Sequence, residues 1–142
     1  MPSLLDINVL VALLDMMHLH HARSYAWFRY NRADGWLTCP LTQNGCIRIL
    51  SQPRYQHPMS VATATEQLQV AVSLGRHQFI PDDISLLDHT RVRTPRIMGH
   101  RQITDVYLLA LAVAHDARLV TLDTRISLSA VPGATESHLV VI

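Results

Sequence analysis

Three aspartates that lie far apart in the sequence have the residue type and the setting needed to hold a divalent metal ion. Asp6 ends the apolar run that begins at Ser3, and Asp123 ends the apolar run that begins at Arg118. Asp105 lies at the start of an apolar helical stretch, where the helix N-terminus favours a carboxylate. Ligands of open parallel sheets bind outside the carboxyl ends of the strands, so we expect the three carboxylates to face one crevice.

Carboxylates that converge in a crevice repel one another, and a hard divalent cation removes that cost. Mg²⁺ and Mn²⁺ prefer oxygen ligands and retain several water molecules beside one or two carboxylates. Such a site activates water and neutralises the charge that develops on a phosphodiester. Each aspartate by itself is equally well explained as a cap of a strand end or a helix. The three together favour a metal site that acts on a phosphodiester.

The elements that must position these aspartates alternate between strands and helices. We expect strands at 3–6, 36–39, 79–80, 118–123 and 139–142. We expect helices at 8–14, 18–30, 41–50, 61–74, 82–92 and 104–115, with Ser60 and Thr104 as N-caps. This order predicts an α/β fold in which helices flank both faces of a mostly parallel sheet. The length fits a single domain over residues 1–142.

Composition excludes several classes of function. The twelve basic residues are all Arg, which rules out a lysine Schiff base and a P-loop lysine. The absence of Lys also counts against a third function, phosphoryl acceptance by Asp6 or Asp123. Cys39 and Cys46 are too few for a disulfide scaffold, and neither a secretory signal nor a membrane-spanning stretch is evident. We therefore expect a protein of the reducing cytoplasm, with no membrane partner.

The chain is also apolar, with 49% hydrophobic residues, 16% charged residues and a mean hydropathy of +0.14. Such a composition predicts that part of the apolar surface is covered by a partner or by a second copy of the chain.

Four motifs in order resemble those of the PIN-domain ribonucleases, and more closely those of the VapC toxins of bacterial toxin–antitoxin pairs. They are Asp6-Ile7-Asn8-Val9-Leu10, Pro40-Leu41-Thr42-Gln43-Asn44-Gly45 with Arg48-Ile49-Leu50, Ile103 to Ala112, and Leu119-Val120-Thr121-Leu122-Asp123. The resemblance implies a three-layer α/β/α fold and Mg²⁺- or Mn²⁺-dependent endoribonuclease activity on structured RNA such as tRNA or rRNA. It implies Asp6, Asp105 and Asp123 as metal ligands, Thr121 beside the metal and Asn8 in support. It also implies a cognate antitoxin, bound partly through the helix at 61–74, and pairing into a homodimer.

Gln43 departs from the family pattern, because the second acidic ligand of the family, normally Glu, falls at this position. An amide keeps one carbonyl oxygen but loses the charge and adds two N–H donors. We therefore expect weaker metal affinity and weakened activity, whether by natural divergence or by an inactivating change. The same feature supports the alternative of a catalytically impaired module that holds RNA or antitoxin.

Two groups of basic residues leave alternatives open. Arg91, Arg93, Arg96 and Arg101 lie in the loop that leads to Asp105, where they would contact RNA phosphates or simply be solvated. His18, His20 and His21 suggest zinc, but no partner ligand has suitable spacing, so core-facing or solvated histidines are favoured.

Overall fold

The sheet consists of five parallel strands in the order β3-β2-β1-β4-β5 in the computed structural model, which describes residues 1–142. The strands are β1 (Ser3–Leu5), β2 (Trp36–Thr38), β3 (His77–Phe79), β4 (Arg118–Thr121) and β5 (Leu139–Val141). β1 pairs with β4 so that Leu5 lies opposite Val120. The two strands that precede Asp6 and Asp123 are therefore direct neighbours at the centre of the sheet.

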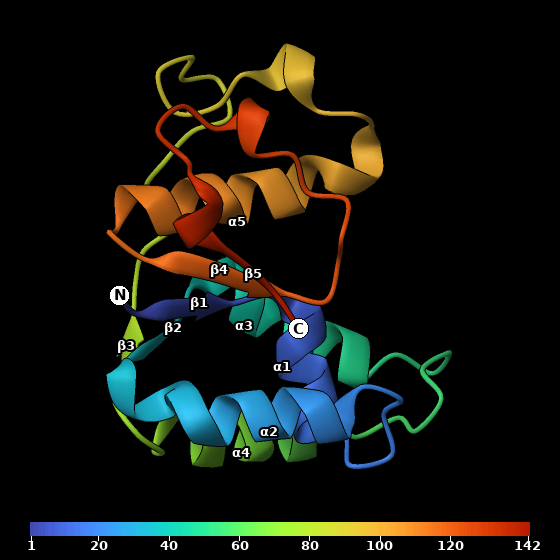
Figure 1. Cartoon of the computed structure of the whole chain (residues 1–142). Helices are drawn as coiled ribbons and strands as arrows, with labels where there is room; N and C mark the ends of the chain where they lie inside the picture. Colours follow the sequence, from blue (N-terminus) through green and yellow to red (C-terminus); the bar gives the residue numbers. More distant parts are fainter.

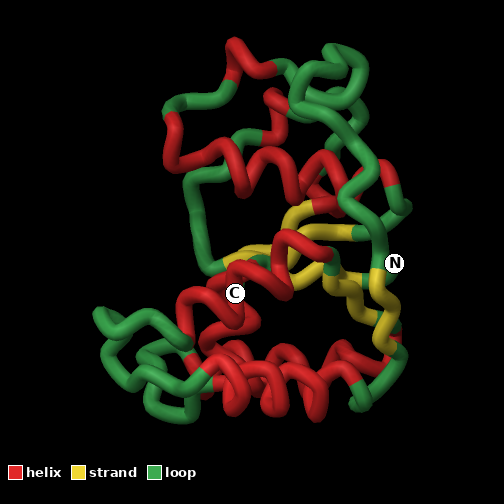
Figure 2. The backbone as a smooth tube through the Cα atoms, turned by 180° about the vertical axis from the view of Figure 1, so that it is seen from behind, coloured by secondary structure: helices red, strands yellow, loops and turns green.

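Helices cover both faces of this sheet, as expected for parallel strands. They are α1 (Ile7–Leu14), α2 (His21–Asn31), α3 (Pro40–Leu50), α4 (Val61–Val72) and α5 (Ile103–Ala114). Figure 1 shows α5 on one face of the sheet and α1 to α4 on the other, and Figure 2 shows the same layers from behind. The predicted three-layer α/β/α fold is thus confirmed. None of these helices has the length and apolar character that crossing a bilayer demands.

The apolar core lies in two parts, one on each side of the sheet. Leu4 and Leu119 pack with the buried face of α5, whereas the neighbouring residues Leu5 and Val120 pack with α1 and α3. Successive side chains of a strand point to opposite faces, so a strand covered on both faces must be apolar at every position. This is why the central strands read as uninterrupted apolar runs.

Local signals fix the starts of the helices on the α1 to α4 face. Asp6 is the N-cap of α1 and accepts a hydrogen bond from the backbone N–H of Ile7. Pro40 occupies the first turn of α3, where its missing N–H costs nothing. Ser60 caps α4 by accepting from the N–H of Thr63 at 3.0 Å, which confirms the predicted cap.

The expected helix at 82–92 is wrong, because residues 82–85 are irregular and turns follow at 86–87 and 89–91. Ser85 accepts a hydrogen bond from the N–H of Leu87, and Asp88 accepts one from the N–H of Thr90. These side chains satisfy the local backbone and favour turns over a helix. Ile84, Leu86 and Val92 of this segment pack against the core, whereas Leu87 is 85% exposed.

Several predicted boundaries also shift. Thr104 is not a cap, because α5 begins at Ile103 directly after a 3₁₀ turn over His100–Gln102. α2 begins only at His21, and β3 ends at Phe79 rather than beginning there. β1 and β4 end at Leu5 and Thr121, so both site aspartates lie just beyond their strands.

Candidate metal centre

Asp6 is the most buried acid of the candidate site, with 2% of its surface exposed. It follows β1 directly, and its N–H donates to the carbonyl of Val120 on β4 at 2.9 Å. Its carboxylate accepts from Oγ1 of Thr121 at 2.8 Å. Burial raises the pKa of Asp6, although the hydrogen bonds from Thr121 and Ile7 oppose this and Asp123 adds to it.

Thr121 joins Asp6 to Asp123. While its hydroxyl donates to Asp6, the same oxygen accepts from the backbone N–H of Asp123 at 3.1 Å. Its side chain is fully buried at the end of β4. Thr121 therefore holds both acidic residues in fixed positions at the ends of two adjacent strands.

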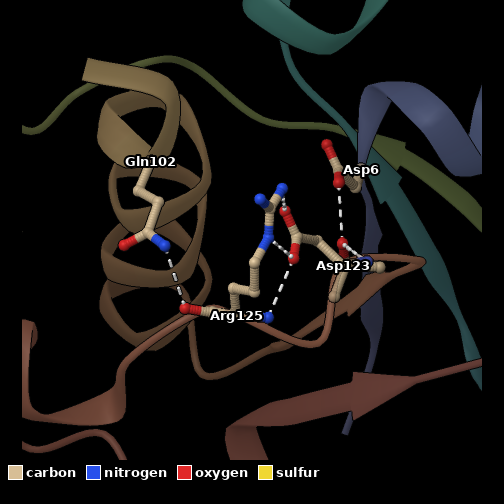
Figure 3. Close-up of polar contacts among 5 residues, drawn as sticks. Asp6, Gln102, Asp123 and Arg125 are labelled. Carbon is tan, nitrogen blue, oxygen red and sulfur yellow. Dashed lines mark hydrogen bonds and ion pairs between the residues drawn. The ribbon is translucent and has the colours of Figure 1, made fainter. Parts of the chain in front are cut away.

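Asp123 is paired with a cation from its own chain. Arg125 donates from Nε to Oδ1 and from Nη2 to Oδ2 of Asp123, each at 3.0 Å, as Figure 3 shows. The guanidinium and the backbone N–H of Arg125 hold the pKa of Asp123 below its usual value. Gln102 contacts the backbone of Arg125, because its Nε2 donates to the carbonyl oxygen of Arg125 at 3.2 Å.

Asp105 completes the acidic group from the opposite face of the sheet. It is the third residue of α5 and is partly buried. Burial, followed by the negative charges of Asp6 and Asp123, raises the pKa of Asp105 to about 6. The structure thus brings the three predicted aspartates within electrostatic reach of one another, although each comes from a different element.

The donor set fits a hard divalent cation held partly through water. The available groups are carboxylate oxygens and one hydroxyl, which are the donors that Mg²⁺ and Mn²⁺ prefer. No three Asp, Glu, His or Cys side chains are close enough together to hold an ion by themselves. An ion here would therefore bind one or two carboxylates directly and keep several waters, as Mg²⁺ commonly does. His18, His20 and His21 likewise form no group of three candidate metal ligands.

Gln43 makes its side-chain hydrogen bond to β2 and not to any of the three aspartates. Its Nε2 donates to Oγ1 of Thr38 at 2.9 Å, and Oγ1 of Thr38 lies 2.8 Å from Nε2 of His77. The side chain also lines a cavity between α3 and α4. Asn8 is exposed in the first turn of α1 and shares a surface cavity with Asp123.

The four arginines of the loop before α5 are separated in space. Arg101 lies beside Arg125 around a cavity of about 290 Å³ near the candidate site. Arg91 lies instead with Asp83, Asp88 and His115 at the other end of α5. Ten helical residues separate Asp105 from His115, which corresponds to roughly 15 Å along the axis. Arg93 and Arg96 are exposed and make no side-chain hydrogen bond.

Two features of the site were missed in the sequence. Arg125 follows the strand-end acid by two residues, a spacing that places it in the same turn and that the sequence does display. The loop that carries His18 and His20 lines the cavity beside Asp123, although it lies more than a hundred residues away in the chain. No local pattern signals that second contact.

Comparison with known proteins agrees with this fold. The model of the PIN domain family matches residues 3–132. Ribonuclease VapC44 of Mycobacterium tuberculosis is 50% identical over 139 residues, covering 98% of this chain and 98% of that protein. Ribonuclease VapC38 of the same species is 43% identical over 122 residues, covering 85% of this chain and 84% of the relative.

The fold has a counterpart among solved structures. The crystal structure of VapBC2 from Rickettsia felis, bound to a DNA fragment from its promoter, superposes with a TM-score of 0.61. The match covers 87% of this chain and 89% of that chain at 17% sequence identity, so it supports a shared fold and nothing further. With the family model and the close relatives, it leads to one conclusion: this chain belongs to the PIN-domain family and, within it, to the VapC type.

Proposed function

We propose that this chain is a metal-dependent endoribonuclease toxin of a type II toxin–antitoxin pair, acting in the cytoplasm on structured RNA such as tRNA or rRNA. One observation carries the proposal: Asp6 and Asp123 follow the adjacent strands β1 and β4, and Asp105 in the first turn of α5 lies close enough to feel the charge of both. The relatives named ribonuclease VapC support the reaction class. The free cysteines Cys39 and Cys46 agree with a reducing compartment.

Each residue then has a defined task. Asp6, Asp105 and Asp123 would hold Mg²⁺ or Mn²⁺, which when bound supplies a Lewis acid for activating water beside the phosphodiester. Thr121 keeps Asp6 and Asp123 in place. Arg101 and Arg125 supply positive charge for RNA phosphates at the rim of the site.

The same proposal includes two protein partners, a cognate antitoxin and a second copy of the chain. Large apolar side chains remain exposed on α2 and α4, among them Tyr30 at 90% and Val70 at 63%. Exposed apolar surface of this kind is typical of a face that another protein covers. The structural neighbour from Rickettsia felis was itself solved as a VapBC complex.

Gln43 supports one alternative, a catalytically impaired module that holds RNA or antitoxin. An amide at this position gives the site three acidic residues instead of four. The hydrogen bond from Gln43 to Thr38 further ties the amide to β2. The two functions differ in metal binding, because a binding module needs no Mn²⁺ at Asp6, Asp105 and Asp123.

The experiment is an RNA cleavage assay with Mn²⁺ on total tRNA and rRNA, run beside calorimetric titration of Mn²⁺. We expect slow cleavage by the unmodified chain, loss of cleavage in Asp105→Asn, and no change in the exposed control Asp34→Asn. Gln43→Glu should bind Mn²⁺ more tightly and cleave faster, because it restores a carboxylate. Mn²⁺ binding without cleavage by either the unmodified chain or Gln43→Glu would contradict the ribonuclease proposal. Equal rates for Gln43→Glu and the unmodified chain would show that position 43 does not matter.

A further inference from the structure

A surface cavity of about 500 Å³ lies directly beside Asp123. Its walls come from the loop between α1 and α2 and from the segment after β4, with Asn8 of α1 between them. The lining residues are Asn8, His18, Leu19, His20, Leu122, Asp123, Thr124 and Arg125. Small-molecule sites commonly measure roughly 300–1,000 Å³, so this cavity has room for a nucleotide.

Two imidazoles in the wall are held in one defined tautomer. Nδ1 of His18 accepts from the backbone N–H of His20 at 3.0 Å, and Nδ1 of His20 accepts from Arg23 at 3.1 Å. A neutral imidazole that accepts at Nδ1 carries its proton at Nε2. Burial, followed by the neighbouring His20, lowers the pKa of His18, which keeps that ring neutral.

The Nε2–H groups of both rings make no hydrogen bond within the protein. The ring centroids lie 5.6 Å apart and the planes are inclined by 49°, so the pair also presents aromatic surface. The cavity therefore offers two fixed N–H donors together with faces on which a planar ring can stack.

The remaining lining groups suit a nucleotide as well. Arg125 brings a guanidinium, and Asn8 and Thr124 bring polar side chains that donate and accept hydrogen bonds. Leu19 is 88% exposed and supplies apolar surface at the wall. Single-stranded RNA is read in this way, by stacking of splayed bases on aromatic or Arg planes and by hydrogen bonds to base edges.

We propose that this cavity is a nucleotide subsite, in which His18 and His20 bind the RNA nucleotide adjoining the phosphodiester held at Asp123. The inference rests on the proposed ribonuclease function and names residues that set its substrate preference. An RNA occupant is favoured over a protein segment because the walls combine ring surfaces, a cation and N–H donors next to the candidate metal ligand.

Asparagine separates the binding role of the two histidines from their role in the loop. At position 18, Asn Oδ1 takes the place of Nδ1 and can still accept from the backbone N–H of residue 20, as in an Asx turn, and at position 20 it can still accept from Arg23. The double variant His18→Asn/His20→Asn therefore keeps the loop but removes both Nε2–H donors and both rings. His138 offers a matched control, because its Nδ1 also accepts from a backbone N–H, that of Thr135 at 3.0 Å, outside the cavity.

The first experiment measures fluorescence anisotropy of a labelled ten-nucleotide RNA of mixed sequence, with Ca²⁺ to suppress cleavage. We expect about tenfold weaker binding by His18→Asn/His20→Asn, in line with two lost hydrogen bonds, and unchanged binding by His138→Asn. Mn²⁺ affinity by calorimetry should be the same for all three proteins. RNA affinity unchanged in the double variant would overturn the subsite and leave the ribonuclease proposal standing. If the unmodified chain binds no RNA, both proposals fail.

A second experiment distinguishes a nucleotide from a bare anion. Each of the four nucleoside 5′-monophosphates and inorganic phosphate is titrated while the imidazole resonances of His18 and His20 are followed by NMR. Shifts with at least one nucleotide and none with phosphate support the subsite. Equal shifts with phosphate alone, or no shift with any nucleotide, would show that the cavity is not a nucleotide site.

Discussion

Asp105 retains its proton to a higher pH than an ordinary aspartate, with a pKa of about 6. The first cause is burial, and the charges of Asp6 and Asp123 come second. A carboxyl group whose pKa is higher in the folded than in the unfolded chain contributes stability at low pH and loses it as the pH rises. The metal-free protein is therefore destabilised by Asp105 above about pH 6, until a cation compensates.

This predicts a pH-dependent effect of Asp105→Asn on the metal-free protein. In EDTA at pH 7.5 the variant should be more stable by about 1 kcal/mol, allowing for solvent screening of a half-exposed group. At this chain length that corresponds to a rise in Tm of about 2–4 °C. At pH 4 the carboxyl is protonated in the folded state, so thermal melts should show little difference. A variant that melts at or below the unmodified chain at pH 7.5 would contradict the account.

Arg125 binds the carboxylate of Asp123, which a metal ion would need as a ligand. Because both oxygens of Asp123 accept from its guanidinium, a cation must share or displace this pair. We predict that Arg125→Gln binds Mn²⁺ about threefold more tightly in calorimetric titrations at low ionic strength. The gain should shrink in high salt, since the pair is exposed. Weaker Mn²⁺ binding by the variant would mean that Arg125 supports the ion instead of competing with it.

At the scale of elements, the contact between α1 and α3 determines where Asp6 lies. Gly45 of α3 packs against Ile7, the residue after Asp6. A Cβ at position 45 would approach Cδ1 of Ile7 to 2.5 Å and Cγ1 to 2.9 Å, so α1 or the Ile7 side chain must shift. The position of the α1 N-terminus therefore depends on glycine at position 45 of α3, because any side chain there would meet Ile7.

Gly45→Ala should accordingly destabilise the protein by about 1–2 kcal/mol, even though Ala is the better helix former. Denaturant unfolding of Gly45→Ala beside the double variant Gly45→Ala/Ile7→Val provides the measurement. Ile7→Val removes Cδ1, the nearest atom, and should recover part of the loss. A single variant as stable as the unmodified chain would show that the helices have room to separate.

The sequence predicted most elements because both faces of the sheet are covered, which makes the central strands apolar throughout. It failed at 82–92, where the side chains of Ser85 and Asp88 accept hydrogen bonds from the backbone of turns and no helix forms. It placed Asp6, Asp105 and Asp123 at the correct ends of their elements. The sequence did not predict the hydrogen bond from Gln43 to Thr38, nor that His18 lines the same cavity as Asp123. Both depend on tertiary packing.

At the scale of the whole molecule, strand order creates the site. β1 and β4 are sequence-distant yet adjacent in the sheet, so the residues that follow them meet at one edge. α5 begins above the same edge on the opposite face from α1 (Figure 1). The three layers therefore contribute one acid each from the start of α1, the start of α5 and the turn after β4.

The exposed apolar side chains lead to a prediction about assembly. Tyr30 and Leu87 each expose at least 85% of their surface. We expect the chain without antitoxin to form a homodimer, with a mass by light scattering of about twice the 16.0 kDa of one copy. If light scattering instead shows a monomer at micromolar concentration, the proposed homodimer is wrong.

The central claim, that Asp6, Asp105 and Asp123 share one divalent ion, is tested most directly by anomalous diffraction from crystals grown with Mn²⁺. The account predicts one strong manganese peak at the carboxyl end of β1 and β4, with at least one of these carboxylates in direct contact and water completing the shell. A map without a peak at that edge, or with manganese bound only elsewhere, would contradict it.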